Sequence, residues 1–310
     1  MYYACVCAIA KDETPHLREW ALHHFAVGFE HIVLYDNGSA VPAARTLADL
    51  ADAGLLTVID FPRREAPQLS AYYHCLRQWK TRSRWLAFID IDEFVLPLGR
   101  RDVRDLLEDY EAWAGLAAHW MVFGSGGHLR RPPAGVTRSY TDGLCLHHHV
   151  KSLVQPQWVL KPLSPHHFAY AEGRFCVNED RVPVLGASSY PVAEKIRINH
   201  YFYKSQQDFE EKIQRGLATA VCGSDGWTLE DFYRQRAVGP VRLIWPLRLF
   251  CPCRRRSAAC RLKNSLPWSR GIARLALRRR SRPLRPWGNP ATWSGPSGAT
   301  RGCAAIRPRH

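Results

Sequence analysis

The sequence Trp85-Leu86-Ala87-Phe88-Ile89-Asp90-Ile91-Asp92-Glu93-Phe94 passes abruptly from an apolar run to three acidic residues. The run before Asp90 predicts a buried strand, because it is short and contains aromatic and branched side chains. Two aspartates spaced i, i+2 on an extended backbone point the same way, and such close like charges favour a cation between them. Carboxylate oxygens suit Mn²⁺ or Mg²⁺. A strand that simply ends in solvated acids explains this stretch equally well, so the rest of the chain decides between the two interpretations.

Strand and helix patterns alternate along the first part of the chain. Strands are expected over residues 4–10, 31–35, 55–59, 85–89 and 119–123, and helices over 47–54, 67–81, 102–113 and 206–218. A further helix is expected before Gly28, with Thr14 as its N-cap and Pro15 in its first turn. This alternation predicts an α/β fold with a mainly parallel sheet.

Polar clusters follow four of the expected strands, at residues 11–13, 36–37, 60 and 90–93. Ligands of open α/β sheets bind at the carboxyl ends of the strands, so these clusters mark the expected site. Residues 124–200 are rich in Gly, Pro, His and aromatic residues. We expect them to form loops that build a substrate pocket on the sheet.

The net charge of +15 comes from the C-terminal end of the chain. Residues 241–310 contain 17 of the 43 lysines and arginines and none of the 28 acidic residues. The basic balance therefore says nothing about what the rest of the chain binds. We expect one domain over residues 1–237, followed by a basic tail over 238–310.

The tail allows several interpretations. A polybasic tail can hold a protein at an anionic membrane surface or bind nucleic acid, and a high net charge also favours disorder. Complete loss of Asp and Glu, with Arg, Pro, Ala, Gly, Trp and Cys dominant, is also what an out-of-frame translation of a GC-rich gene yields. We hypothesise such a frameshift after about residue 237. Resequencing the gene tests this, and an intact frame through the stop codon would refute it.

The ten cysteines follow no disulfide or metal-binding framework. Six lie before the tail and are expected to be free thiols, most of them buried: Cys5, Cys7, Cys75, Cys145, Cys176 and Cys222. No secretion signal follows Met1, and Arg242 and Arg248 interrupt the best candidate for a membrane-spanning stretch. These features predict a cytoplasmic protein, peripheral at the inner face of the membrane if the tail binds there.

Two groups of histidines resemble metal-binding material, His147-His148-His149 and His166-His167. Consecutive residues on a strand point to opposite faces, so we expect no zinc site at either group.

Four ordered blocks within residues 3–220 resemble the DUF23-like glycosyltransferases, that is, glycosyltransferase family 92 and its bacterial family 2-like relatives. The blocks are Lys11-Asp12-Glu13 with Leu17-x-Glu19-Trp20 and His23-His24; Leu34-Tyr35-Asp36-Asn37-Gly38-Ser39; the stretch from Trp85 to Phe94; and Ile198-Asn199-His200-Tyr201-Phe202-x-Lys204-Ser205 followed by Phe209, Lys212, Arg215 and Gly216. Between them lie Trp120-x-x-Phe123-Gly124-Ser125-x-Gly127-His128 and Lys151-Ser152, also as in that family. His167 matches a family histidine and is a further pocket candidate. Trp120 is equally well interpreted as a platform for a sugar ring or as a core residue.

The resemblance implies a GT-A fold, a nucleotide-diphosphosugar donor (a UDP-sugar is favoured) and Mn²⁺ or Mg²⁺ held by the Asp-x-Asp motif. It also implies a nucleotide-binding half (1–97) and an acceptor and metal half (98–237) within the domain. We therefore expect metal ligands at Asp90, Asp92 and His200. Residues expected at the nucleotide are Ala8, Lys11, Glu13, Asp36, Asn37, Gln68, Asp90 and His128. Asn37-Gly38 also suits a plain turn. Lys204 is expected to stabilise the diphosphate and Glu93 to act in catalysis, while Glu172, Glu179 and Glu194 are other candidates for the base.

The predicted function is metal-dependent transfer of a hexose to a glycan or lipid-linked acceptor, with inversion. A nucleotidyltransferase is the leading alternative among enzymes, but residues 10–13 contain none of the glycines of a phosphate-binding loop. A second alternative is an inactive nucleotide-sugar-binding relative or scaffold, tethered by the basic tail. The interpretation as a nucleic-acid-binding protein depends on the tail alone, so nucleic acid is not the expected partner.

Overall fold

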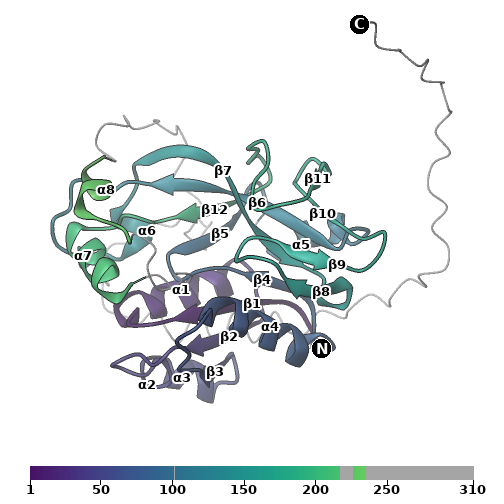
Figure 1. Ribbon diagram of the computed structural model, residues 1–310, viewed down its shortest axis with the longest axis horizontal. Helices are drawn as coiled ribbons and strands as arrows, with labels where there is room; N and C mark the ends of the chain where they lie inside the picture. Colours follow the sequence, from purple (N-terminus) through teal and green to yellow (C-terminus); the bar gives the residue numbers. More distant parts are fainter. Residues whose placement is uncertain (101, 217–225, 235–310) are drawn as a thin grey trace, which may run out of the picture.

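The computed structural model describes residues 1–100, 102–216 and 226–234 (Figure 1). Its main sheet has ten strands, with the order β11-β10-β6-β7-β4-β1-β2-β3 along its principal path. The strands β1 (Tyr2–Ala10), β2 (His31–Asp36), β3 (Leu56–Asp60) and β4 (Ser83–Phe88) pair in parallel. Their carboxyl ends therefore meet at one edge, as the alternation of strands and helices predicted.

The second half of the sheet is mixed. The strands β6 (Gly115–Phe123) and β7 (Gly143–Val154) form an antiparallel pair, and β7 continues the sheet onto β4. The strands β10 (Cys176–Val177) and β12 (Ile196–His200) run parallel to β6, whereas β5 (Glu93–Pro97) and β11 (Pro183–Val184) pair antiparallel to β12 and β10. The α/β class is confirmed, and the mainly parallel order holds for the first half.

Residues 124–200 contain more regular structure than the loops that composition predicted. Besides β7 and β10–β12, this region contains a separate two-stranded sheet of β8 (Val159–Pro162) and β9 (Phe168–Tyr170). Glycine, proline and histidine lower strand propensity locally, but pairing with β6 and β4 outweighs that preference.

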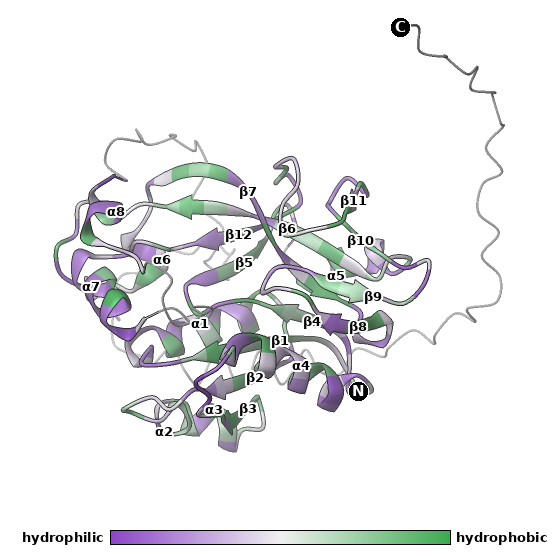
Figure 2. Ribbon diagram, in the orientation of Figure 1, coloured by the Kyte–Doolittle hydropathy of each residue, from purple (hydrophilic) through white to green (hydrophobic). Residues whose placement is uncertain are grey.

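Helices cover both faces of the first half (Figure 1). The helices α1 (Thr14–Ala26), α2 (Ala43–Thr46), α3 (Ala48–Asp52) and α5 (Val103–Leu107) contribute to the apolar cluster that contains Ala4, Val6 and Ala8 of β1. The helix α4 (Pro67–Trp79) and the β8–β9 sheet contribute to the cluster on the opposite face, with Cys5 and Cys7. Figure 2 shows hydrophobic stretches along β6 and β7, whereas α7 is mainly hydrophilic. This alternation of faces along β1 is the two-residue period of a strand.

Three short helices lie beyond β6 in sequence: α6 (Val136–Ser139), α7 (Gln206–Arg215) and α8 (Leu229–Arg234). The helix α7 begins at a capping box, in which Ser205 and Asp208 satisfy each other's backbone N–H groups, and ends at Gly216 with φ +79°. Salt bridges from α7 to Asp92 and Glu13 place this helix over the carboxyl ends of β4 and β1.

Several helix boundaries differ from those expected. Thr14 is the first helical residue and Glu13 is the N-cap, so Thr14 is not the cap. The helix expected over 47–54 is split between α2 and α3, and the one expected over 102–113 is α5 followed by the 3₁₀ turn Glu108–Tyr110. Gly28 follows α1 with φ +109°, as its predicted role as a helix stop requires.

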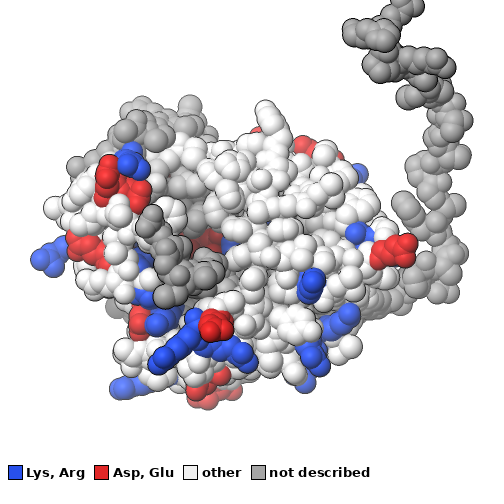
Figure 3. All heavy atoms as spheres, in the orientation of Figure 1, with Lys and Arg blue, Asp and Glu red and all other residues white. Residues whose placement is uncertain are grey.

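The five cysteines of the described part are free thiols, and all but Cys145 are buried. Cys222, the tail and the interpretations that depend on it lie outside the described residues. Among the helices described, none has the length and apolar character needed to cross a bilayer. On the face drawn in Figure 3, acidic side chains lie among the lysines and arginines of the described residues.

Candidate functional site

The acidic stretch forms a tight turn between β4 and β5. The backbone N–H of Glu93 donates to the carbonyl of Asp90 (3.1 Å), and the Glu93 carboxylate accepts from the backbone N–H of Asp90 (2.8 Å). The Trp20 indole N–H of α1 lies 3.0 and 2.9 Å from the carbonyls of Asp90 and Glu93. The extended backbone expected for Asp90 and Asp92 is therefore wrong: β4 ends at Phe88, and the turn directs the two carboxylates to different partners.

Asp90 faces the β7 and α4 side of the turn. One carboxylate oxygen lies 2.9 Å from the Lys151 ammonium, and the other accepts from the Gln68 amide at 2.5 Å and from the Tyr72 hydroxyl at 3.4 Å. The side chain of Lys151 is fully buried, whereas that of Asp90 remains 35% exposed. Burial alone would lower the pKa of Lys151, but the carboxylates of Asp90 and Glu93 raise it. Asp90 is thus an ordered, accessible carboxylate whose charge is partly balanced.

Glu93 lies beneath this turn. Its side chain has no exposed surface, one oxygen lies 3.5 Å from the Lys151 ammonium, and the other has no hydrogen-bond partner. Burial and the neighbouring aspartates raise the pKa of its carboxyl well above the ordinary value, although Lys151 opposes this. The catalytic role expected for Glu93 would require contact with a substrate hydroxyl, and in this structure its burial prevents that contact.

Asp92 faces the opposite side, toward β12 and α7. Lys212 of α7 lies 2.9 Å from one carboxylate oxygen, and the His200 ring nitrogen Nε2 lies 3.6 Å from the other. Burial alone would raise the pKa of the Asp92 carboxyl, but the nearby cations, first Lys212 and further along Lys204, hold it well below its usual range. The carboxylate is therefore ionised at neutral pH.

His200 presents a neutral imidazole to Asp92. Burial lowers the pKa of its ring, although Asp92 opposes this. Its other nitrogen, Nδ1, is buried without a hydrogen-bond partner. An ionised carboxylate beside a neutral imidazole is a donor set that suits a divalent cation such as Mn²⁺, so these two residues fit the metal that the motif implies.

The expected nucleotide residues fall into two groups. Gln68 contacts Asp90 directly, as described. Asp36 lies at the end of β2 and accepts the backbone N–H groups of Ser39 (3.0 Å) and Ala43 (2.7 Å), so it shapes the loop after the strand. Asn37 similarly accepts from the backbone N–H of Arg63 at 2.8 Å. These contacts are those of a turn, which the Asn-Gly pair also predicted, and they give the loop a fixed shape at the edge of the sheet.

Other expected residues lie farther from the two aspartates or are enclosed. Ala8 is fully buried inside β1, with its side chain in the core, and Lys11 is exposed after the end of the strand. Glu13 forms a salt bridge of 2.6 Å with Arg215 of α7. The His128 ring packs against Tyr140 at 5.7 Å. Lys204 is buried with φ +50°.

The three glutamates considered as alternative bases differ in exposure. Glu179 is buried, and its carboxylate accepts the backbone N–H groups of Glu194, Lys195 and Ile196 (2.5–3.0 Å), which is a structural role. Glu172 and Glu194 are exposed.

Lys151 and Lys212 are among the residues that carry the family resemblance, but no role was predicted for either of them. Each meets its aspartate only through the tertiary fold, since 61 residues separate Lys151 from Asp90 and 120 separate Lys212 from Asp92. The one indication that pointed to Lys151 is its position in the carboxyl-terminal part of β7, where Val150 to Val154 are all buried.

Trp120 lies among histidines rather than open to a ligand. Its ring contacts those of His147, His149, His166 and His200 at 4.3–5.9 Å. The indole nitrogen is buried without a partner. Trp120 is partly exposed, and side chains of the protein itself take up part of the ring surface that a sugar platform would offer.

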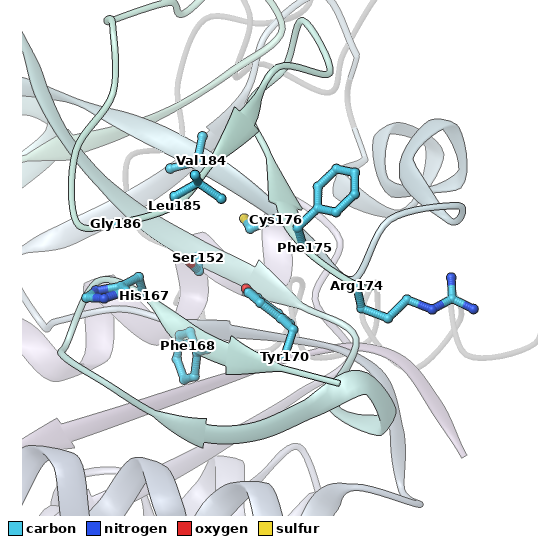
Figure 4. Close-up of a pocket in the computed structure, with 10 residues that line it drawn as sticks. All are labelled: Ser152, His167, Phe168, Tyr170, Arg174, Phe175, Cys176, Val184, Leu185 and Gly186. Atoms are coloured by element: carbon cyan, nitrogen blue, oxygen red, sulfur yellow. The ribbon is translucent and has the colours of Figure 1, made fainter. Parts of the chain in front are cut away.

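A pocket lies apart from the two aspartates, between β9 and the strands β10 and β11 (Figure 4). His167 lies at its edge, and the Tyr170 hydroxyl points toward its centre, but the pocket is not the aspartate site for which His167 was a candidate. Asp90, Asp92 and His200 are not among its lining residues. It is a separate feature of the surface.

Comparison of the chain with known proteins agrees with the family resemblance of the four sequence blocks. Residues 1–129 match the family model of glycosyltransferase family 92. A glycosyltransferase family 92 protein of Oryza sativa subsp. japonica is 30% identical over 263 residues, covering 80% of this chain and 42% of that protein. One from Ricinus communis is 29% identical over 228 residues, covering 70% and 38%. The galactan beta-1,4-galactosyltransferase GALS2 of Arabidopsis thaliana is 25% identical over 136 residues, covering 40% and 26%. The chain thus spans about two fifths of the length of the first two relatives.

Solved structures show weaker similarity. S. aureus TarS in complex with UDP superimposes with a TM-score of 0.30 at 13% identity, over 42% of this chain and 38% of TarS. A mannosyltransferase from Pyrobaculum calidifontis in complex with GDP-Man and Mn²⁺ gives 0.30 at 16% identity, over 38% and 35%. These similarities are too low to bear on the function of this chain. The sequence matches do bear on its family: the resemblance carried by the four blocks is confirmed, and the chain carries a glycosyltransferase family 92 domain.

Proposed function

We propose that the protein transfers a hexose from a nucleotide-diphosphosugar to a glycan or lipid-linked acceptor, with a divalent cation and with inversion at the anomeric carbon. The observation that carries the proposal is the turn at the carboxyl edge of the sheet. It holds Asp90 and Asp92 rigidly and gives them different surroundings. The family match supports glycosyl transfer, and the similarity to a galactosyltransferase supports a hexose as the transferred sugar.

In this proposal Asp90 binds the nucleoside part of the donor. A carboxylate that is fixed by Gln68 and Lys151 but partly exposed can accept hydrogen bonds from the two hydroxyls of a ribose. The neighbouring loop that Asp36 shapes would border the base. Glu93 acts as a positioning residue, because it holds the backbone N–H of Asp90 from beneath.

Asp92 and His200 would hold Mn²⁺ or Mg²⁺, which supplies positive charge to the leaving diphosphate when it is bound. Lys204 and Lys212 add fixed positive charge on the same side, since both act electrostatically on Asp92. Fixed charges of this kind stabilise the negative charge that develops on the diphosphate as its bond to the anomeric carbon of the sugar breaks. The buried surroundings strengthen each of these interactions, because the local dielectric is low.

Titration calorimetry of the full chain with UDP and with GDP, each with and without Mn²⁺, tests this proposal. We expect binding of one nucleotide that requires Mn²⁺ and is lost in the Asp92→Asn variant. Asp49→Asn is the matched control, because Asp49 is an exposed acid paired with Arg18 far from the turn in sequence. Metal-independent binding, or equal binding by both variants, would contradict the proposal.

The arrangement also favours a second candidate, an inactive relative that binds a nucleotide-sugar. Lys151 and Lys212 each lie 2.9 Å from one of the aspartates, so protein cations already balance the charges that a metal would balance. Radiolabelled donor hydrolysis and transfer assays distinguish the candidates. Metal-dependent binding with no hydrolysis and no transfer to any acceptor supports the binding protein, whereas hydrolysis lost in Asp92→Asn supports the enzyme.

A further inference from the structure

The three consecutive histidines of β7 lie at a bulge. The pairing of β7 with β6 passes from His119–Val150 directly to Trp120–His147, so that two residues of β7, His148 and His149, have no opposite residue in β6. His149 instead forms an isolated bridge with Ser188. A bulge of this kind breaks the strict alternation of side chains along a strand. The expectation that these histidines point to opposite faces, and therefore form no metal site, does not hold at this point of the chain.

The bulge brings the three imidazoles together. One potential ligand atom from each of His147, His148 and His149 lies within 4.8 Å of the other two. The Nδ1 atoms of His147 and His149 are only 3.2 Å apart. Two nitrogens bound to one tetrahedral Zn²⁺ at about 2.0–2.1 Å lie about 3.3 Å from each other, which is close to the observed separation.

The rings are held from one side and open on the other. The Trp120 indole stacks on the His149 ring (5.2 Å, 12° between planes) and lies 5.9 Å from that of His147, which fixes their position. His148 is exposed, whereas His147 and His149 are half-buried. A cation can therefore reach the cluster from solvent through His148.

The charge state of the rings suits metal binding. Burial, together with repulsion from the neighbouring histidines, lowers the pKa of His147 to about 4, and the same causes lower the pKa of His149. These two imidazoles are neutral at pH 7, which is the form that binds a metal.

We propose that His147, His148 and His149 form a binding site for a transition metal of the Zn²⁺ type, separate from the Asp92–His200 pair. Three imidazoles leave one tetrahedral position open to solvent or to a ligand oxygen. Nitrogen donors favour Cu²⁺, Ni²⁺ and Zn²⁺ over Mn²⁺, and Mg²⁺ binds them poorly. The site does not depend on the proposed glycosyl transfer.

The test is a spectroscopic titration of the full chain, prepared without a histidine tag and stripped with EDTA, with Co²⁺ alone at pH 7.5. We expect the visible absorption of tetrahedral Co²⁺ to saturate at one equivalent, to be displaced by Zn²⁺ and to be unaffected by Mg²⁺. A histidine site gives no sulfur-to-cobalt charge-transfer band, whereas a site built from the cysteines of the chain would give one.

Three variants make the result specific. His148→Ala removes an exposed ligand and should weaken Co²⁺ binding by more than about tenfold, the loss that even an outer partner of a metal ligand can cause. His167→Ala, a histidine outside the cluster, and Asp92→Asn should both keep the full signal. Equal binding by His148→Ala, a thiolate band, loss of binding in Asp92→Asn, or no tetrahedral absorption would each overturn the proposal and leave His147 and His149 as a simple hydrogen-bonded pair.

Discussion

Replacement of the buried Lys151 by methionine should destabilise the protein strongly. The change removes the cation that lies 2.9 Å from Asp90 and 3.5 Å from Glu93 and leaves both carboxylates on the same turn. Asp90 is 35% exposed, so its share of the pair is screened and worth at most about 1 kcal/mol. Glu93 has no exposed surface, and removing one partner of a buried ion pair costs about 3–5 kcal/mol. The Glu93 contact therefore dominates the expected loss.

Urea denaturation followed by circular dichroism measures this effect. We expect Lys151→Met to lower the free energy of unfolding by about 3–5 kcal/mol, and the double variant Lys151→Met with Glu93→Gln to recover more than about 1 kcal/mol of it, because a neutral amide is easier to bury than a carboxylate. Arg18→Met is the control, since its exposed salt bridge with Asp49 contributes less than about 1 kcal/mol. A loss for Lys151→Met no larger than that of the control, or no recovery in the double variant, would refute this account of the buried charges.

Three further predictions concern α7 and α1. Lys212→Met should lower kcat/KM for donor hydrolysis about 10²-fold in a steady-state assay without unfolding the protein. The reason is that it removes a fixed positive charge beside the proposed diphosphate site. An unchanged kcat/KM would contradict that role of Lys212. His16, Ser205 and Arg131 lower the pKa of the Asp208 carboxyl well below 3.8, although burial opposes this. The stability that Asp208 contributes is therefore complete above pH 3.8 and is lost as the pH falls further. The urea midpoints of the wild type and of Asp208→Asn should differ at pH 7 and converge toward pH 2, and a constant difference would argue against this account. Gly28→Ala should cost more than about 2 kcal/mol, because φ is +109° and the added Cβ would lie 2.1 Å from Asp102, whereas Gly54→Ala, with φ +66° and open space, should cost only about 1 kcal/mol in the same denaturation experiment.

The local sequence was sufficient for most elements of the first half. The strands β1, β2 and β4 are continuous apolar runs because they are buried on both faces, and α1 and α4 repeat apolar residues at helical spacing. The region after Phe123 was not predictable in the same way. Its strands pair with partners far away along the chain, and glycine- and histidine-rich composition hid them until the β6–β7 pairing was known.

The sequence by itself determined that two aspartates follow a buried strand at the carboxyl edge of an α/β sheet, and the family resemblance added His200 to them as an expected metal ligand. Only the tertiary structure decided what surrounds them. Lys151 and Lys212 reach the turn from β7 and α7, and their pairing depends on how distant elements cross, which no local pattern encodes. The three histidines of β7 make the same point, because a register shift against β6, rather than their spacing in the chain, determines that their rings meet.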